Sequence, residues 1–239
     1  MAFFKKSSLN NRLKTAVVAQ QRDIEVPAGL FRGRDAAGCL LRGAREARTP
    51  VPYDPEREKW MSLVGGADIF EVVKRRVSLS DVESRLYAYI DLVVRTSGEI
   101  VLVMLRKNDL SIEAPLNADV FDMTAAMYLS GVHSGLVVYF SGEKMSSFFV
   151  NPDKKAYKEL LEVIISGSHV LFASELRGQM PDGNPGRLCT SCPYGNNCAI
   201  SAHGGNSGIC KDGWDTEGSG GGNRSEAGER TGTDAPTEQ

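Results

Sequence analysis

Apolar residues are concentrated in the centre of the chain, in runs that have the length and composition of β-strands. Most positions in these runs are β-branched, aliphatic or aromatic, which favours extended structure. Polar segments with the sequences RTSG and GEKM separate two pairs of runs and predict hairpin turns. The sequence therefore predicts five strands, in residues 69–77, 85–94, 99–106, 135–140 and 146–150.

Helical periodicity occurs before, between and after these strands. Apolar residues recur every three or four positions in residues 8–22, 117–131 and 152–167, and residues 35–47 form a further helical candidate that contains Cys39. Residues 49–55 hold three prolines in seven positions and predict a loop. The order of helix, three strands, helix, two strands and helix predicts one α/β domain with a mixed sheet.

Charge is unevenly distributed, although the formal net charge is only −2. Residues 1–48 carry ten basic and four acidic side chains, whereas residues 211–239 carry three basic and seven acidic ones. A basic front half suits a polyanion or an acidic protein surface, and the alternative is an ordinary solvated surface beside an acidic tail. The residues expected to contact nucleic acid or a partner are Lys5, Lys6, Arg12, Lys14, Arg32, Arg34, Lys74, Arg75 and Arg76.

The two ends of the sequence differ from its centre. After Cys210 the sequence is dominated by Gly, Ser, Thr and charged residues, which predicts a disordered acidic tail. We expect a basic arm or helix in residues 1–29, one domain in residues 30–210 and the tail in residues 211–239. The apolar runs are shorter than the roughly 20 residues that a membrane span needs, and the first residues lack the charge order of a secretory signal. A cytoplasmic protein without a membrane partner is expected.

Three cysteines, Cys189, Cys192 and Cys198, lie within ten residues with the spacing C-x2-C-x5-C. In a reducing compartment, clustered cysteines are more often metal ligands or catalytic groups than disulfides. Zinc sites and iron–sulfur clusters both use four thiolates. Structural zinc sites usually have two C-x2-C pairs close in sequence, but only one such pair occurs here. The remaining cysteines are Cys39, far upstream, and Cys210, which is expected to be a free thiol.

One cysteine in an N-terminal helix and C-x2-C-x5-C after the last helix resemble the iron–sulfur nucleases of the RecB type. These include the CRISPR-associated RecB-like exonucleases and the AddB nuclease domain, and the CPY sequence at Cys192 is similar to the family's C-x2-C-P-aromatic. The resemblance spans roughly residues 30–200. It implies an α/β restriction-endonuclease-like core, with a mixed central sheet flanked by helices and closed by a four-cysteine metal cluster. Cys39, Cys189, Cys192 and Cys198 would ligate a 4Fe–4S cluster that joins the two ends of the domain, and zinc is the alternative.

The same resemblance implies an incomplete catalytic site. The family carries an Asp on one strand and Glu-x-Lys on the next, followed by Gln-x-x-x-Tyr on a helix. Here Asp91 and Tyr128 match, but Met104 and Arg106 stand at the Glu and Lys positions and Thr124 stands at the Gln position. A thioether is a poor ligand for a hard cation, and arginine does not release its proton. We therefore expect no catalytic residues and no nuclease activity.

Three function classes follow from these features. The first is a non-catalytic accessory factor in DNA recombination that binds a recombinase, DNA or both. The second is an active metal-dependent single-strand DNA exonuclease with a relocated carboxylate, and the third is a redox-sensing DNA-binding protein. KKSSLNNRLKTA and QRDIEVPAGL are also similar to phage recombination directionality factors, which bind serine integrases. This second resemblance implies an integrase partner in a host cytoplasm and favours the first class.

Overall fold

A mixed sheet of six strands forms the centre of the protein. The computed structural model describes residues 17–18, 24–108 and 112–181. The strands follow the order β1-β2-β3-β4-β5-β6 across the sheet, and every neighbouring pair is antiparallel except β4 and β5, which are parallel. A parallel pair needs a crossover connection, and helix α5 provides it. The strands are β1 (Val17–Val18), β2 (Glu71–Asp81), β3 (Leu86–Thr96), β4 (Glu99–Lys107), β5 (Gly135–Ser141) and β6 (Lys144–Val150).

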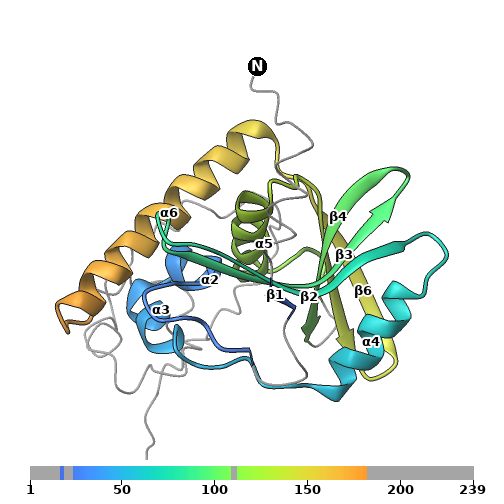
Figure 1. Cartoon of the computed structure of the whole chain (residues 1–239), viewed down its shortest axis with the longest axis horizontal. Helices are drawn as coiled ribbons and strands as arrows, with labels where there is room; N and C mark the ends of the chain where they lie inside the picture. The colour runs from blue at the N-terminus through green and yellow to red at the C-terminus, as the bar shows by residue number, and fades with distance from the viewer. Residues whose placement is uncertain (1–16, 19–23, 109–111, 182–239) are drawn as a thin grey trace, which may run out of the picture.

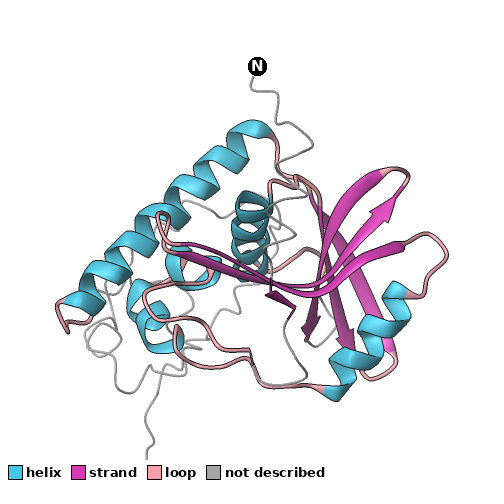
Figure 2. Cartoon of the chain, viewed as in Figure 1, coloured by secondary structure: helices cyan, strands magenta, loops and turns pink. Residues whose placement is uncertain are grey.

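Helices cover both faces of this sheet (Figure 1). One face carries α5 and α6 together with the two short helices α2 and α3, whereas the opposite face carries α4. Figure 2 shows the same separation of helices and strands. The helices are α2 (Gly33–Ala37), α3 (Leu40–Glu46), α4 (Pro55–Gly65), α5 (Asn117–Ser130) and α6 (Lys154–Leu176).

Strand β5 explains why the core has two layers. Its side chains alternate, so Val137 and Tyr139 pack toward α5, whereas Val138 and Phe140 pack toward α4. The ring of Phe140 is stacked on the Trp60 ring, with 6.2 Å between their centroids. A strand that is buried on both faces must be apolar almost throughout, and the GLVVYF run has that composition.

Local signals define where several elements begin and end. Asp54 caps α4 by accepting a hydrogen bond from Glu56 N, and Pro55 occupies the first helical position. Asp153 caps α6 in the same way, through Lys155 N and Ala156 N. Helix α5 ends at Gly131, whose φ of 74° is readily adopted only by glycine.

The structure confirms the five predicted strands and the helices predicted in residues 117–131 and 152–167. The sequence does not predict helix α4, because the three prolines of residues 49–55 indicate a loop; the third of them, Pro55, begins the helix. The single helix predicted in residues 35–47 is wrong, since Cys39 lies between α2 and α3.

The helix predicted in residues 8–22 is wrong at Val17–Val18, which pair with Val77 and Ser78 as a strand, and its remaining residues lie outside the described part. A partner strand decides the conformation of such a β-branched pair more strongly than its local periodicity does. Residues Ile24 and Val26 are buried against Tyr87 and thus belong to the packed body. None of the described helices has the length and apolar character required to cross a membrane.

Candidate functional site

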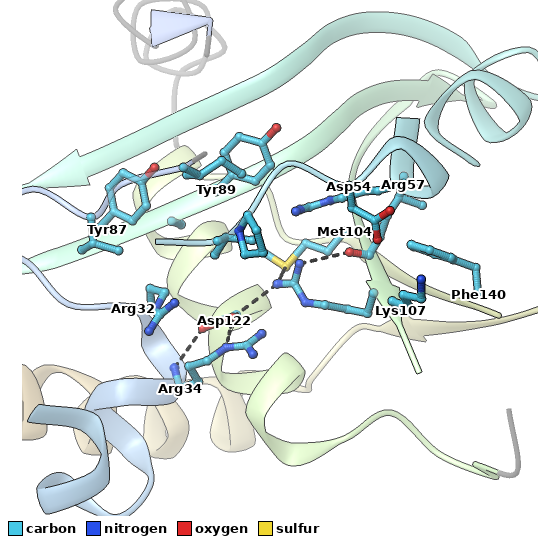
Figure 3. A pocket seen from close by; sticks show the side chains of 17 residues that line it. Arg32, Arg34, Asp54, Arg57, Tyr87, Tyr89, Met104, Lys107, Asp122 and Phe140 are labelled. Carbon is cyan, nitrogen blue, oxygen red and sulfur yellow. Dashed lines mark hydrogen bonds and ion pairs between the residues drawn. The ribbon is translucent and has the colours of Figure 1, made fainter. Parts of the chain in front are cut away.

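A pocket of about 210 Å³ lies where α2, α4 and the end of β4 meet the beginning of β3 (Figure 3). Five basic side chains line it, and two acidic ones, Asp54 and Asp122, accompany them. The rest of the lining is mainly aliphatic and aromatic. The basic residues are Arg32, Arg34, Arg57, Arg106 and Lys107.

Asp91 on β3 is not part of the pocket lining, and its side chain accepts three hydrogen bonds. Its Oδ1 accepts from Nε of Arg57 at 2.7 Å, and its Oδ2 accepts from Nη2 of Arg57 at 3.0 Å. Oδ2 also accepts from the backbone N–H of Leu105 at 2.7 Å. The pairing of β3 with β4 reaches Leu92 opposite Val103, so the carboxylate provides a partner for a buried amide just beyond the paired register.

The strand next to Asp91 is irregular. Register pairs Arg75 with Leu92 and Val77 with Ile90, so Arg76 lies across from Asp91. Arg76 has a φ of 52°, a left-handed conformation that is unusual for a residue with a side chain inside a strand. Its guanidinium pairs with Glu58 of α4, directly beside the Arg57–Asp91 pair. Two adjacent ion pairs therefore hold the first turn of α4 against the sheet at this point.

A third contact completes the attachment of α4. Glu56 accepts a hydrogen bond from the backbone N–H of Gly142 at 2.7 Å and pairs with Lys107 Nζ at 2.7 Å. Lys107 and Arg106 alternate on β4, so Lys107 faces α4 and Arg106 faces α5.

Arg106 belongs to a cluster of four charges with Arg34, Asp119 and Asp122. Asp119 Oδ1 accepts from both arginines at 2.8 Å, while Asp122 lies 2.5 Å from Arg34 Nε and 3.3 Å from Arg106 Nη2. Tyr139 donates its hydroxyl proton to Asp119 Oδ2 at 2.7 Å. Two cations and two anions alternate, so the cluster is neutral as a whole.

Burial and charge act in opposite directions on this cluster. Burial disfavours the charged form of Asp122, but the charges of Arg34 and Arg106 outweigh burial and hold its pKa below the ordinary value. The same carboxylates raise the pKa of Arg34 despite its burial. Burial, together with Asp119, raises the pKa of Tyr139, which keeps the hydroxyl protonated as a donor. Arg34, Asp122 and Tyr139 are therefore held in the protonation states that their neighbours require.

The structure brings together only part of the predicted catalytic remnant. Asp91, Met104 and Arg106 lie close to one another, and Met104 is buried with its sulfur 3.3 Å from Arg106 Nη2. Thr124 is buried inside α5 and donates to the carbonyl of Val120, while Tyr128 packs against the apolar core. Neither residue lines the pocket.

No group of three or more His, Cys, Asp or Glu side chains is arranged to hold a metal ion within the described residues. Of the four predicted cluster ligands, only Cys39 is described; it is half-buried and occupies the N-cap position of α3. Cys189, Cys192 and Cys198 lie outside the described residues, as does Cys210.

Most of the basic residues predicted to contact nucleic acid or a partner have internal partners where they are described. Arg32 binds Asp35 at 2.7 Å and the Glu46 carbonyl at 2.7 Å, and Arg34 belongs to the charge cluster. Arg75 and Lys74 lie on β2 beside Arg76. Contact of these five described residues with an external partner stays a prediction. The other four predicted contact residues lie outside the described residues: Lys5, Lys6, Arg12 and Lys14.

Sequence reasoning missed several residues of the site. Arg57 lies directly after the predicted loop of residues 49–55, and no residue near it in the sequence indicated that it has a buried partner. Asp119 and Asp122 carried a usable signal, because two acids three positions apart interrupt an otherwise apolar helix that buries most of its surface. Buried acids of this kind require cations, but the sequence does not say which ones.

Comparison with known proteins gives limited information. No protein-family model matches the sequence, and no curated protein matches it. Among solved structures, SSO0001 is similar with 13% identity and a TM-score of 0.46, covering 82% of this chain and 94% of its own. The alkaline exonuclease LHK-Exo from Laribacter hongkongensis is similar with 10% identity and a TM-score of 0.45, covering 73% of this chain and 95% of its own. Both TM-scores lie below 0.5, so neither similarity assigns an activity to this protein.

Proposed function

We propose that this protein is a non-catalytic accessory factor in DNA recombination, built on a degenerate RecB-type nuclease core, which acts by binding a recombinase, DNA or both. The observation that carries the proposal is the state of Asp91. Its two oxygens accept three hydrogen bonds, two of them from the permanently charged Arg57. A divalent cation at this carboxylate would have to displace a guanidinium that is buried beside it.

The neighbouring groups support the same conclusion. Met104 offers sulfur where a hard metal ion needs oxygen, and it contacts Arg106 instead. Arg106 is neutralised by Asp119 and Asp122, so it has a structural role in this arrangement. The carboxylates that line the pocket or lie directly behind it are engaged with an arginine or with a helix N-terminus. A protein that keeps the core but not the metal site is suited to binding rather than cleavage.

The proposal includes a cluster, 4Fe–4S or alternatively zinc, held by Cys39, Cys189, Cys192 and Cys198. The surroundings of Cys39 are compatible with it. A Cβ on Gly167 of α6 would lie 1.8 Å from the carbonyl oxygen of Ala36, so α2 and α6 touch through their backbones. Arg48, just after α3, pairs with Glu175 near the end of α6 at 2.6 Å.

These contacts bring the end of α6 close to the α2–α3 region that holds Cys39. The eight steps along the chain from Pro181 to Cys189 could span at most about 29 Å, at roughly 3.3–3.6 Å per residue. The cluster would supply a structural cross-link between the two ends of the domain. In this role Cys39 contributes one thiolate from the N-terminal side.

The nuclease part of the proposal is tested with purified protein, linear single- and double-stranded DNA, and Mn²⁺ or Mg²⁺. We expect no degradation by either the wild type or Asp91→Ala. Degradation by the wild type that disappears in an Asp91→Ala protein with an unchanged circular dichroism spectrum would show an active exonuclease and overturn the proposal. A Lys155→Gln variant, altered on the exposed side of α6, controls for contaminating nuclease, since it should behave as the wild type does.

The partner-binding part is tested by capture of a recombinase. The tagged protein is incubated with extract of its native host, and bound proteins are identified by mass spectrometry. We expect an integrase-type recombinase to be enriched over a tag-only control, and direct binding to persist after nuclease treatment of the extract. Loss of the signal after nuclease treatment would assign the association to DNA alone.

A further inference from the structure

Strand β6 lies at one end of the sheet, and within the described residues no strand pairs with its outer side. The carbonyl of Phe140 accepts a hydrogen bond from the backbone N–H of Asn108, so the backbone of Phe140 is hydrogen-bonded toward β4. Phe140 lies opposite Met145 in the antiparallel β5–β6 pair. Because hydrogen-bonded and non-hydrogen-bonded pairs alternate along such a ladder, the backbone groups of Met145, Ser147 and Phe149 point away from β5. The outer side of β6 therefore presents the N–H and carbonyl groups of these three residues.

The same three residues carry the exposed side chains of this edge. Met145 and Phe149 are 51% and 63% exposed, and Ser147 between them is exposed as well. Their partners on β5 belong to the part of the core that packs against α4, so all three side chains lie on the α4 side of the sheet. An edge strand that exposes large apolar side chains beside outward-facing backbone groups is suited to association with another strand.

The opposite edge of the sheet is built differently. Among the described residues, β1 pairs with only two residues in the second half of β2, so the first half of β2 is also at an edge. That half contains several charged residues, a register shift between Val72 and Lys74 and the left-handed Arg76. Charges and irregular backbone are features by which proteins prevent strand edges from pairing. By contrast, β6 has a regular register, no proline and a single charged residue, Lys144, at its first position.

The sequence of β6 is complementary to itself. Two copies of β6 related by a two-fold axis at Ser147 would form an antiparallel pair in which Met145 of each copy lies opposite Phe149 of the other. A thioether and an aromatic ring make a favourable cross-strand contact. A register displaced by two residues would instead place Ser147 opposite one of these apolar side chains. In the symmetric register Lys144 lies opposite Val150, so no like charges meet.

We propose that the outer edge of β6 is an interface with a second copy of this chain, which joins two sheets through a β6–β6 pair about a two-fold axis at Ser147. The symmetric spacing of Met145 and Phe149 about Ser147 selects a second copy as the occupant, since an unrelated strand would not require it. A ladder of seven residues is a small interface, so the dimer is weak, with a Kd on the order of 10 µM. This inference concerns the assembly of the chain and does not depend on the proposed function.

The test measures self-association of the full-length protein by sedimentation velocity at concentrations from about 1 to about 300 µM. The variants are Met145→Lys, Phe149→Glu and the combination of the two. Val82→Glu is the matched control, because it changes another exposed apolar residue, in the turn between β2 and β3. All the changed side chains are exposed, so every variant should keep the circular dichroism spectrum of the wild type.

The wild type should pass from monomer to dimer as its concentration rises. Each single variant at the β6 edge should raise the Kd at least about tenfold, because a charge then faces an apolar side chain in both halves of the symmetric pair. In Met145→Lys/Phe149→Glu the introduced charges are of opposite sign and face each other across the axis. The Kd of this double variant should therefore return to within about threefold of the wild-type value, and Val82→Glu should associate as the wild type does.

Several results would overturn the proposal. These are a wild type that stays monomeric at about 300 µM, association that neither single variant at β6 weakens, and a double variant that associates no better than the single variants. Hydrogen exchange measured by NMR tests the other occupants of the edge. Slow exchange of the Met145, Ser147 and Phe149 amides in the monomer would show that another segment of the same chain covers β6, which also overturns the proposal. Protection that appears only as the dimer forms supports it.

Discussion

Removal of one partner from the Arg57–Asp91 pair should destabilise the protein severely. Asp91 is 1% exposed, and Arg57 supplies two of its three hydrogen bonds. In Arg57→Met the carboxylate of Asp91 stays buried. Of its three hydrogen bonds, only the one from the Leu105 backbone N–H remains. Breaking a buried ion pair in this way costs about 3–5 kcal/mol, because an uncompensated charge remains in the core.

Removal of both partners should cost much less. In the double variant Arg57→Met/Asp91→Leu no charge is left unpaired, and replacement of a buried pair by apolar residues is often neutral or stabilising. The Leu105 amide loses its acceptor, which costs about 1–3 kcal/mol. We therefore expect the double variant to be more stable than Arg57→Met alone.

Urea unfolding followed by circular dichroism measures these differences. The four proteins of the cycle, namely wild type, two single variants and the double variant, should unfold with similar m-values, so that midpoints report stability. A cost below about 1 kcal/mol for Arg57→Met would refute the reasoning, as would a double variant whose cost equals the sum of the two single costs. Either result would mean that the pair is solvated or that α4 is held by its other contacts.

Three further predictions concern acid stability, helix contact and the cluster. The pKa of Asp122 in the folded protein is lowered from its ordinary value of 3.8. The ionised Asp122 therefore stabilises the protein fully above pH 3.8, and this stabilisation is lost as the pH falls through the folded pKa. Asp122→Asn should flatten the dependence of the urea midpoint on pH between about 2 and 5. Gly167→Ala should lower stability by about 1–3 kcal/mol, since its methyl group would overlap the Ala36 carbonyl, whereas Ser166→Ala on the exposed side should have little effect in the same urea assay. Anaerobically purified protein should be brown with about four iron atoms per molecule, and Cys39→Ser should lose colour and iron; a colourless protein with stoichiometric zinc would contradict the iron–sulfur assignment.

The sequence predicted the elements that have strong and regular apolar patterns. The strand GLVVYF and the helix at 117–131 were correct, because a buried strand and a long helix leave clear periodicity. Helix α4 was missed, since prolines before a helix and prolines within a loop look alike in a sequence. Val17–Val18 had helical neighbours, but a partner strand determined their conformation.

For the site, the alignment of Asp91 with Met104 and Arg106 was available from the sequence, and the structure brings these residues together. The residues that form ion pairs with Asp91 and Arg106 could not be predicted from the sequence. Arg57 reaches Asp91 across 34 positions, and Arg34 reaches Asp119 and Asp122 across 85 and 88. Such pairings depend on the packing of separate helices against one sheet, which local patterns do not encode.

The sequence by itself determined the α/β class, the central strands and the residue types at 91, 104 and 106, the positions singled out by the resemblance to RecB-type nucleases. These properties depend on side-chain periodicity and chemistry at single positions. Only the tertiary structure decided that arginines from α2, α4 and β4 meet the buried carboxylates and line a small pocket between them. The physical reason is that a buried charge must find an opposite charge, and its distance in space, not in sequence, decides which one it finds.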